Sequence, residues 1–375
     1  MITVKEVVTK RDLKSFVEFP VKLYKDSPYF VPSIYEEEME NFNPKKNPAY
    51  EFCETKLFLA YKDNKIVGRI AGLISHAYNE KVNRNLMRFT RFDFIDDIEV
   101  SKALIEAVEN WANERKMEAL MGPIGFTDID KQGMLVEGFE EKDLSITLYN
   151  YSYYPKHMDT LGFEKDVDWV EFQIFVPEKL DERIERIAKL VSKRYGFHRV
   201  KFKKNKELYP YAIEAFDVIN QAFAKLYGTV PLTDAIIKKS INDYISNINL
   251  DYAIVIVDKD GKVIGFGLLV PSLAEALKKS KGRLFPFGFI RVLRAMKQNK
   301  ILEMYFIAVK PEYQNMGVNA LIMAEAVKEG IKNGVEYAET GPELETNMVI
   351  QQWKDFPNRH HRRRRCYFKK LNNKA

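Results

Sequence analysis

Apolar residues along this chain fall into short runs separated by polar turns, and the same arrangement occurs twice. Each half contains two apolar runs joined by a short polar turn, which predicts a β-hairpin. The paired runs are 57–61 with 66–74, and 252–257 with 263–270. A third apolar run follows each hairpin, over 87–92 and over 302–309. We therefore expect three consecutive strands in each half of the chain.

In each half, a segment with apolar residues at helical spacing follows the third expected strand. Leu104, Val108 and Trp111 recur at helical intervals in the first half, and residues 321–331 do so in the second. The other expected elements are helices at 12–24, 178–195 and 207–225 and a closing strand at 169–176. This order of elements predicts an α+β fold with a mixed sheet and one crossover helix in each half.

Three sequence matches in the same order indicate an internal duplication. Residues 65–74 resemble 262–270, residues 103–105 recur as 320–322, and the Gly-Pro pair at 122 recurs at 341. The offset between the copies grows from 197 to 217 residues, so the second copy carries an insertion around 272–299. The sequence therefore predicts two domains, 1–176 and 177–375, which meet near Pro177.

The composition is that of a folded globular chain, with 46% hydrophobic and 30% charged residues. We expect no membrane span, because no apolar run approaches the roughly eighteen residues that a span requires. Cys53 and Cys366 are too few for a disulfide framework and lack the spacing of zinc ligands. His360 and His361 are adjacent, which places them on opposite faces of a strand. The sequence thus predicts a cytoplasmic protein without a metal site.

Charge is divided unevenly between the two halves. Residues 1–176 hold 23 Lys and Arg against 31 Asp and Glu, so the basic excess of the chain lies in the second half. Most of that excess lies in two stretches without an acid, 278–300 and 359–370. Three interpretations are open: solvated faces with docking of the two halves, a site for an anionic cofactor or substrate, and contact with nucleic acid or anionic lipid.

The sharpest functional signal follows the strand at 302–309. Residues 310–320 read Lys-Pro-Glu-Tyr-Gln-Asn-Met-Gly-Val-Asn-Ala, and a helix is expected to start immediately after them. A turn that enters a helix in this way presents free N–H groups and the positive end of the helix dipole, which suits a pyrophosphate. The segment resembles the pyrophosphate loop Q/R-x-x-G-x-G/A of the GCN5-related N-acetyltransferase (GNAT) superfamily. Asn319 stands where the pattern has its second small residue.

The resemblance covers nearly the whole chain, because both halves have the element order of the superfamily and residues 42–163 look like tandem GNAT proteins. It implies two tandem GNAT-like domains, with acetyl-CoA or another acyl-CoA bound by the second one. It also implies transfer of the acyl group to the amine of a small molecule or peptide. The implied cofactor-binding residues are Ile307, Val309, Gln314, Asn315, Met316, Gly317, Val318, Asn319 and Asn347.

The corresponding loop of the first half has lost its glycine. An offset of 217 places Val100 opposite Gly317. The neighbouring acids Asp96, Asp97 and Glu99 would satisfy the helix N-terminus themselves and repel a phosphate. We expect the first half to be a degenerate GNAT fold that binds no acyl-CoA and serves as a scaffold or as one wall of the acceptor pocket.

The resemblance also suggests catalytic residues. A carboxylate on the strand before the loop often acts as the base, and Glu303 is the candidate there, with Glu339 on the next strand as the second choice. Alternation along a strand predicts that residues 303, 305, 307 and 309 share one face. The usual thiolate donor is a Tyr, but Trp353 occupies its place, and an indole N–H is a poor acid.

The leading hypothesis is an acyl-CoA-dependent N-acyltransferase. A non-catalytic binding protein with the same fold is one alternative, which Trp353 and Asn319 favour. An aminoacyl-tRNA-dependent transferase is another, because the basic insertion could follow an RNA backbone, although nucleic acid is the less favoured partner. The long connection at 127–154 is expected to form an interface or part of the acceptor site.

Overall fold

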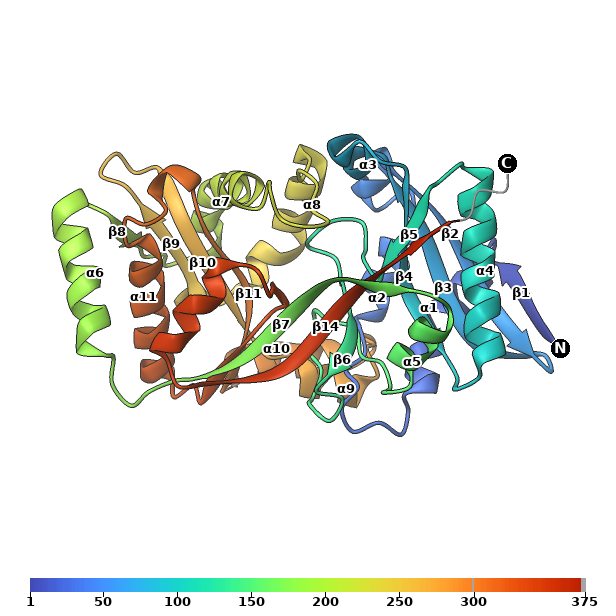
Figure 1. The fold of residues 1–375 in the computed structure, drawn as a ribbon. Helices are drawn as coiled ribbons and strands as arrows, with labels where there is room; N and C mark the ends of the chain where they lie inside the picture. The colour runs from blue at the N-terminus through green and yellow to red at the C-terminus, as the bar shows by residue number, and fades with distance from the viewer. Residues whose placement is uncertain (299, 372–375) are drawn as a thin grey trace.

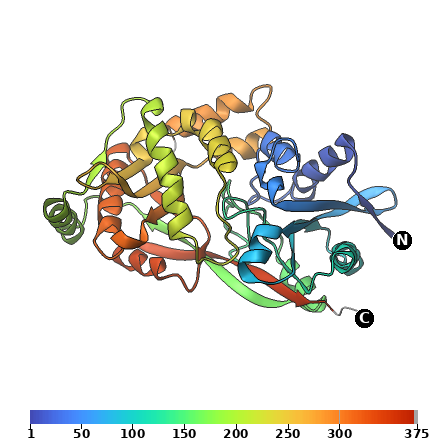
Figure 2. The same cartoon turned by 90° about the horizontal axis from the view of Figure 1, so that it is seen from above.

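The computed structural model describes residues 1–298 and 300–371. In this part of the chain one mixed sheet runs through the whole molecule, in the order β1-β2-β3-β4-β5-β14-β7-β12-β11-β10-β9-β8 (Figure 1). Strands β6 and β13 pair with β14 and β7 at its centre. The first half of the chain forms one end of the molecule and the second half the other (Figure 2). The predicted α+β mixed-sheet fold is confirmed.

The elements of the first half begin with an edge strand and a helix. The strands are β1 (Ile2–Glu6), β2 (Cys53–Lys62), β3 (Lys65–Ser75), β4 (Leu86–Phe94), β5 (Ala119–Gly122), β6 (Met134–Glu137) and β7 (Glu164–Phe175). The α-helices are α1 (Lys10–Leu23), α2 (Tyr35–Asn41), α3 (His76–Val82), α4 (Ile98–Glu114) and α5 (Tyr154–Thr160).

The second half repeats this order in outline, and its connection between β10 and β11 is a longer helical insertion. Its strands are β8 (His198–Val200), β9 (Ala253–Val257), β10 (Val263–Pro271), β11 (Ile301–Val309), β12 (Tyr337–Thr340), β13 (Glu343–Leu344) and β14 (Asn358–Lys370). Its α-helices are α6 (Glu182–Tyr195), α7 (Tyr209–Ala222), α8 (Asp234–Tyr244), α9 (Ala274–Ser280), α10 (Gly288–Gln298) and α11 (Val318–Asn333).

Both predicted hairpins are present, as β2–β3 and β9–β10. The sequence match between them has a packing reason, because each hairpin carries a glycine under the crossover helix of its half. A Cβ on Gly68 would lie 2.7 Å from Leu104 of α4, and a Cβ on Gly265 would lie 2.9 Å from Val318 of α11. Such distances are shorter than carbon atoms tolerate, so the glycines allow the helices to approach the sheet.

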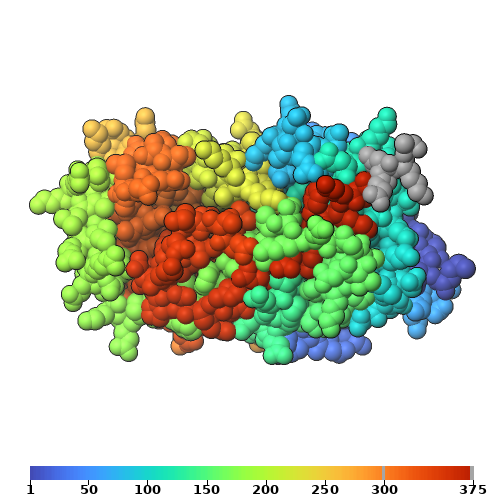
Figure 3. Space-filling view, in the orientation of Figure 1, coloured from blue at the N-terminus to red at the C-terminus, as the bar shows by residue number. Residues whose placement is uncertain are grey.

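The two halves exchange their last strands. Strand β7 belongs to the first half in sequence, but it pairs with β12 of the second half, with Tyr337 opposite Phe175. Strand β14 ends the second half, but it pairs with β5 of the first half, with Tyr367 opposite Gly122. The two exchanged strands also pair with each other along most of their length. In the space-filling view, the red C-terminal segment accordingly reaches across the molecule into the first half (Figure 3).

Apolar packing also joins the halves. Two large core clusters lie mainly in one half each, one around α4 and one around α6 and α11, and each also contains residues of the strand that the other half contributes. A third cluster contains residues of both halves, including Phe16 and Leu59 from the first and Ile219 and Phe266 from the second. The halves therefore share a core as well as a sheet, which agrees with the expectation that they dock on each other.

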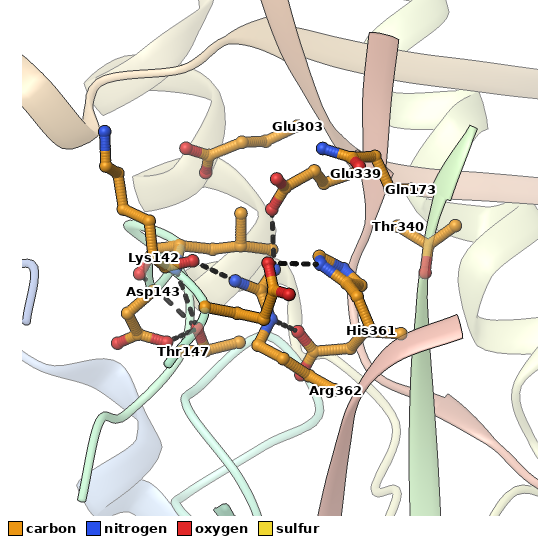
Figure 4. A network of polar contacts seen from close by, with 12 residues as sticks. Lys142, Asp143, Thr147, Gln173, Glu303, Glu339, Thr340, His361 and Arg362 are labelled. Carbon is orange, nitrogen blue, oxygen red and sulfur yellow. Dashed lines mark hydrogen bonds and ion pairs between the residues drawn. The ribbon is translucent and has the colours of Figure 1, made fainter. Parts of the chain in front are cut away.

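The basic run at 359–370 forms β14, and its arginines face acids of the protein (Figure 4). Arg362 is fully buried and binds Glu171 at 2.5 Å and Glu339 at 2.6 Å. Arg364 binds Glu171 as well as Asp143 of the first half, at 2.8 Å to the latter. Of the three interpretations of the basic stretches, docking of the halves therefore applies to this one.

Candidate functional site

The candidate site lies where β11 and β12 separate. The two parallel strands pair only as far as Met304 and Thr340, and β11 then continues to Val309. No strand in the described part of the chain covers this edge of β11 beyond Met304. A strand edge without a partner offers N–H and C=O groups to an extended ligand.

A β-bulge at Tyr305 produces the separation. On the β10 side, Leu268 lies opposite Phe306 and Leu269 lies opposite Met304, so Tyr305 is an extra residue in β11. A bulge bends the strand and increases its twist, and bulges are frequent beside active sites.

The bulge also reverses the faces of the strand. Beyond it, Ile307 and Val309 pack into the core around α6 and α11, whereas Ala308 belongs to the core shared with the first half. The prediction that residues 303, 305, 307 and 309 share one face is therefore wrong, because the extra residue interrupts the alternation. Val309 is buried, so it can offer a ligand only its main-chain groups, whereas the side chain of Ile307 is partly exposed.

The predicted pyrophosphate loop connects β11 to α11. Asn315 and Gly317 adopt left-handed conformations, with φ of 63° and 83°, and Gly317 is the N-cap of α11. Among the described residues no side chain caps this helix. The side chain of Gln314 donates from Nε2 to the carbonyl of Val309 at 3.3 Å. The loop thus leaves the positive end of the α11 dipole open.

The other predicted loop residues differ in exposure. Val318 is buried and Met316 packs against the second core, whereas Asn315 and Asn319 are exposed. Asn319 lies in the first turn of α11, so its side chain stands at the helix N-terminus.

Glu303 lies on β11 just before the separation, and its side chain is 1% exposed. Both carboxylate oxygens accept hydrogen bonds, one from the Ser145 hydroxyl at 2.7 Å and the other from the Ser272 hydroxyl at 2.8 Å. Burial raises the pKa of Glu303 to about 7, and the two serine hydroxyls oppose that rise because they stabilise the carboxylate. A carboxylate with this pKa is suited to accept a proton near neutral pH.

The first half contributes directly to this site. Ser145 belongs to the connection at 127–154, and its hydroxyl oxygen also lies 3.1 Å from the Tyr305 hydroxyl. The single hydrogen of the Ser145 hydroxyl is directed to Glu303, so Tyr305 donates to Ser145. Tyr305, Ser145 and Glu303 therefore form a hydrogen-bonded chain across the boundary between the halves. The structure supports the interface interpretation of the connection, and the acceptor-site interpretation stays a prediction.

The second-choice base, Glu339, has another partner. Its Oε2 lies 2.6 Å from Nη2 of Arg362, within the ion-pair network of β14 (Figure 4). Glu339 and Glu303 are neighbours across the β11–β12 ladder, and the Glu339 charge contributes to the raised pKa of Glu303. Of the two carboxylates, only Glu303 has hydroxyl groups rather than a cation as its partners.

Two further predicted residues have structural partners. The Asn347 side chain caps a short 3₁₀ helix, Met348–Asp355, by accepting from the Val349 N–H at 3.1 Å. Trp353 is 1% exposed and lies in the second core, where its Nε1 donates to Glu343 at 2.7 Å. The indole N–H is therefore already used within the protein.

The first half contains the same separation of strands, but its own residues fill it. Strand β4 pairs with β5 only as far as Arg88. At the end of β4 the Phe94 N–H donates to the Tyr154 hydroxyl at 3.0 Å, and the Tyr153 hydroxyl donates to the Phe94 carbonyl at 2.5 Å. Two tyrosine hydroxyls thus form hydrogen bonds with the main-chain groups at the end of β4. The corresponding groups at the end of β11 lie on its open edge.

The helix N-terminus of the first half is also satisfied. Asp97 is the N-cap of α4 and accepts from the Glu99 N–H at 3.1 Å. The expected capping by an acid is confirmed. That the first half binds no acyl-CoA stays a prediction, now supported by the tyrosines as well.

Sequence patterns did not predict Ser145 or Ser272 as site residues. Ser145 lies 158 positions before Glu303, and Ser272 lies at the start of the insertion. Isolated serines carry no spacing signal, and only the fold brings these two to one carboxylate. Tyr305 lies near Glu303, as strand alternation predicts, and both contact Ser145. The bulge changes the alternation only for the residues after Tyr305.

Comparisons with known proteins agree with this geometry. The model of the acetyltransferase (GNAT) family matches residues 220–348, which include β11, the loop and α11. A solved tandem GNAT protein from the clavulanic acid biosynthesis pathway superposes with a TM-score of 0.56, over 99% of this chain and 98% of its own, at 9% identity. Residues 220–348 therefore match the GNAT family, and the whole chain has the fold of a tandem GNAT protein.

Two curated relatives align with most of the chain. Protein YghO of Escherichia coli K12 is 26% identical over 355 residues, which cover 92% of this chain and 89% of the relative. The bacterial ceramide synthase of Caulobacter vibrioides is 24% identical over 326 residues, which cover 84% of this chain and 82% of the relative.

Proposed function

We propose that this protein is an acyl-CoA-dependent N-acyltransferase whose second half binds the acyl-CoA. One observation carries the proposal: the bulge at Tyr305 opens the edge of β11 directly between a buried carboxylate with a raised pKa and the uncapped N-terminus of α11. The open edge fits the amide groups of a pantetheine arm, and the loop at 314–319 fits the pyrophosphate. An acyl-CoA donor also agrees with the cytosol as the expected compartment.

In this reaction the acyl-CoA supplies a thioester carbonyl for attack by an amine. Glu303 accepts the amine proton as the C–N bond forms and the C–S bond breaks, and Ser145 and Ser272 hold its carboxylate in place. Trp353 is bound to Glu343 and supplies no proton at this point. A thiol has an ordinary pKa of about 8.5, so the departing thiolate can take its proton from water near neutral pH.

The acceptor that we favour is a hydrophobic amine. A ceramide is the amide of a fatty acid with the amino group of a long-chain base, so the ceramide synthase relative supports N-acylation of such an amine. A cavity of about 680 Å³ between the first half and the insertion of the second half is lined in part by Val17, Val21, Phe30 and Tyr149. Thr147, from the same connection as Ser145, also lines it. This volume is within the range of small-molecule sites.

We expect acetyl-CoA to bind one site per chain and Asn319→Glu to weaken that binding at least tenfold. The new carboxylate would stand beside the pyrophosphate at the start of α11, where an added like charge is repulsive. It should not harm the fold, because an acid in the first turn is favourable to a helix. Gly317→Glu is a poorer probe, since a Cβ at Gly317 would lie 2.4 Å from Val191.

The matched control for this measurement is Asn113→Glu, the same exchange at an exposed position of α4 in the first half. Calorimetric titration of the three proteins should show unchanged affinity for the control. Two equivalent sites per chain, or equal affinity for wild type and Asn319→Glu, would contradict the assignment of the loop.

Ser145→Ala should shift the acidic limb of the pH–rate profile to higher pH. The Ser145 hydroxyl lowers the pKa of Glu303 because it donates a hydrogen bond to the charged form. Without this hydroxyl, the effect of burial is larger and the pKa of Glu303 rises further. Since Glu303 acts as its carboxylate, activity would then appear only at higher pH. A profile of kcat/KM against pH checks this, and an unshifted limb would mean that Glu303 is not the titrating base.

The alternative, a binding protein without catalysis, is favoured by the position of Trp353 in the core. The two functions differ in one outcome. A binding protein would bind acyl-CoA and release no free CoA thiol with any amine, including long-chain amines, whereas the transferase would release one thiol per amide formed.

A further inference from the structure

Large apolar side chains are unusually exposed in the insertion of the second half. Five of them lie within nine residues, at the turn before α10 and on its first turns: Phe285 (69% exposed), Phe287 (66%), Phe289 (40%), Ile290 (37%) and Leu293 (45%). We call this set the α10 patch. Isolated exposed apolar residues are normal on protein surfaces, but a contiguous group of this kind marks an interaction site.

The α10 patch is not the face by which α10 packs on the protein. The packed face of α10 consists of Val292, Ala295 and Met296. These side chains contact a small core cluster that includes Val31 and Leu277. The helix therefore has an inner apolar face that is covered and an outer apolar edge that extends onto the preceding turn. In Figure 2 the orange insertion lies along one border of the molecule, beside the helices of the first half.

The segment that contains the α10 patch is also rich in basic residues. Residues 278–300 contain eight Lys and Arg and no acid. Lys278 and Arg283 are used for docking, because they contact the Pro28 carbonyl and Glu18 of the first half. Arg291, Arg294 and Lys297 are exposed on α10, and within the described residues they form no ion pair. Together with the patch they give a short helix with apolar residues and unpaired cations on its outer side.

We propose that the α10 patch is a docking site for an anionic phospholipid surface. Amphipathic helices with Phe and Leu on one face and Lys and Arg on the other lie in the plane of the membrane interface. The exposed phenylalanines would enter the boundary between headgroups and acyl chains, and Arg291, Arg294 and Lys297 would face the anionic headgroups. Among the described residues, no helix is long and apolar enough to cross a membrane.

The composition of the patch favours lipid over nucleic acid. Single-stranded nucleic acids stack bases on aromatic rings and bring phosphates to cations, which would use the phenylalanines and arginines. They would leave the aliphatic Ile290 and Leu293 without a partner, whereas a bilayer accepts aromatic and aliphatic side chains equally.

This inference does not depend on the proposed reaction, since docking is a binding property. It nevertheless adds to it, because Lys278, Ser280 and Arg283 of the same insertion line the rim of the 680 Å³ cavity. A docked molecule would present that rim close to the lipid surface.

The test is flotation of the full-length protein with vesicles of phosphatidylcholine alone and of phosphatidylcholine with phosphatidylglycerol. Wild type should float with the anionic vesicles and bind the neutral ones at least tenfold more weakly. Phe285→Ser with Phe287→Ser should lower the partition at least tenfold, because two apolar side chains no longer insert. Arg294→Gln should lower it about fivefold, and added salt should weaken the wild type.

The control is Leu190→Ser with Ile213→Ser, which removes two other exposed apolar side chains, at 60% and 50% exposure, from α6 and α7. This variant should float like wild type. Three results would overturn the proposal: no flotation with anionic vesicles, equal loss in the control, or concentration-dependent dimers without lipid that the Phe285 and Phe287 changes abolish. Preferential binding of bulk RNA over anionic vesicles would also reassign the patch.

Discussion

Glu303→Gln is expected to lower kcat by about 10²–10⁴-fold, the usual contribution of a general base. The amide keeps the shape of the side chain, and its oxygen can still accept a hydrogen bond from Ser145 or Ser272, but it cannot take the amine proton. Acetyl-CoA affinity should stay unchanged, because Glu303 lies in the paired part of β11, before the bulge, whereas the loop at 314–319 follows the end of the strand. Steady-state kinetics with a long-chain amine would measure the loss of kcat, and calorimetric titration would show whether the affinity for acetyl-CoA is unchanged.

The same variant is expected to be more stable than wild type above pH 7. The pKa of Glu303 is about 7 in the folded protein and near its ordinary 4.5 in the unfolded chain. Between these two values the unfolded state has lost the proton that the folded state keeps, so folding stability falls as pH rises through that window. The neutral amide of the variant avoids the cost of the buried charge, on the order of 3 kcal/mol, and Tm should rise accordingly at pH 8 but not at pH 4.

Glu343→Gln provides a matched control. Burial raises the pKa of Glu343 to about 7 as well, and its side chain accepts from Trp353 in the core. This variant should gain stability in the same pH window and keep full activity. Equal loss of activity in both variants would show that buried charge in general, rather than proton acceptance by Glu303, controls turnover.

Removal of β14 is expected to prevent folding of both halves. A chain that ends at residue 357 loses the strand between β5 and β7, so the sheet is interrupted at its centre. It also leaves Glu171 fully buried without Arg362 and Arg364. An uncompensated buried charge alone costs about 3–5 kcal/mol, which is comparable with the whole stability of many domains. The far-UV circular dichroism and thermal unfolding of the truncated protein check this expectation.

Deletion of residues 1–8 is the control, because it removes β1, an edge strand that pairs only with β2. Only a small loss of Tm is expected there. The halves 1–176 and 177–375 should likewise fail to fold when produced separately, since each then lacks a central strand. Stable monomeric halves would contradict the exchange of strands.

Local pattern was sufficient to predict most elements of each half. The hairpins follow from two apolar runs around a polar turn, and α11 follows from helical spacing after Gly317. Glu303 was predicted because a base on this strand is implied by the superfamily. These features depend on residues that are close in sequence.

The partners of the last strands could not be predicted in the same way. Residues 169–176 are rich in the residue types that form strands, but such a run does not show which strand lies alongside. Arg362 and Arg364 appeared as part of a basic run, because the acids that neutralise them lie more than 190 positions away or on another strand. The Tyr305 bulge is also invisible in sequence, since one extra residue in a ladder is defined only by the partner strand.

The exchange of strands has a consequence for synthesis on the ribosome. Strand β5 is complete once Gly122 has been added, but the strand that covers it begins at Asn358. At about 5–20 residues per second, the edge of β5 remains open for roughly 10–50 s in each chain. An open strand edge can pair with another chain, and the nascent chains of one polysome lie close together. The first half of this protein is therefore made before it can fold completely, and its yield in a cell should depend on chaperones that shield the growing chain.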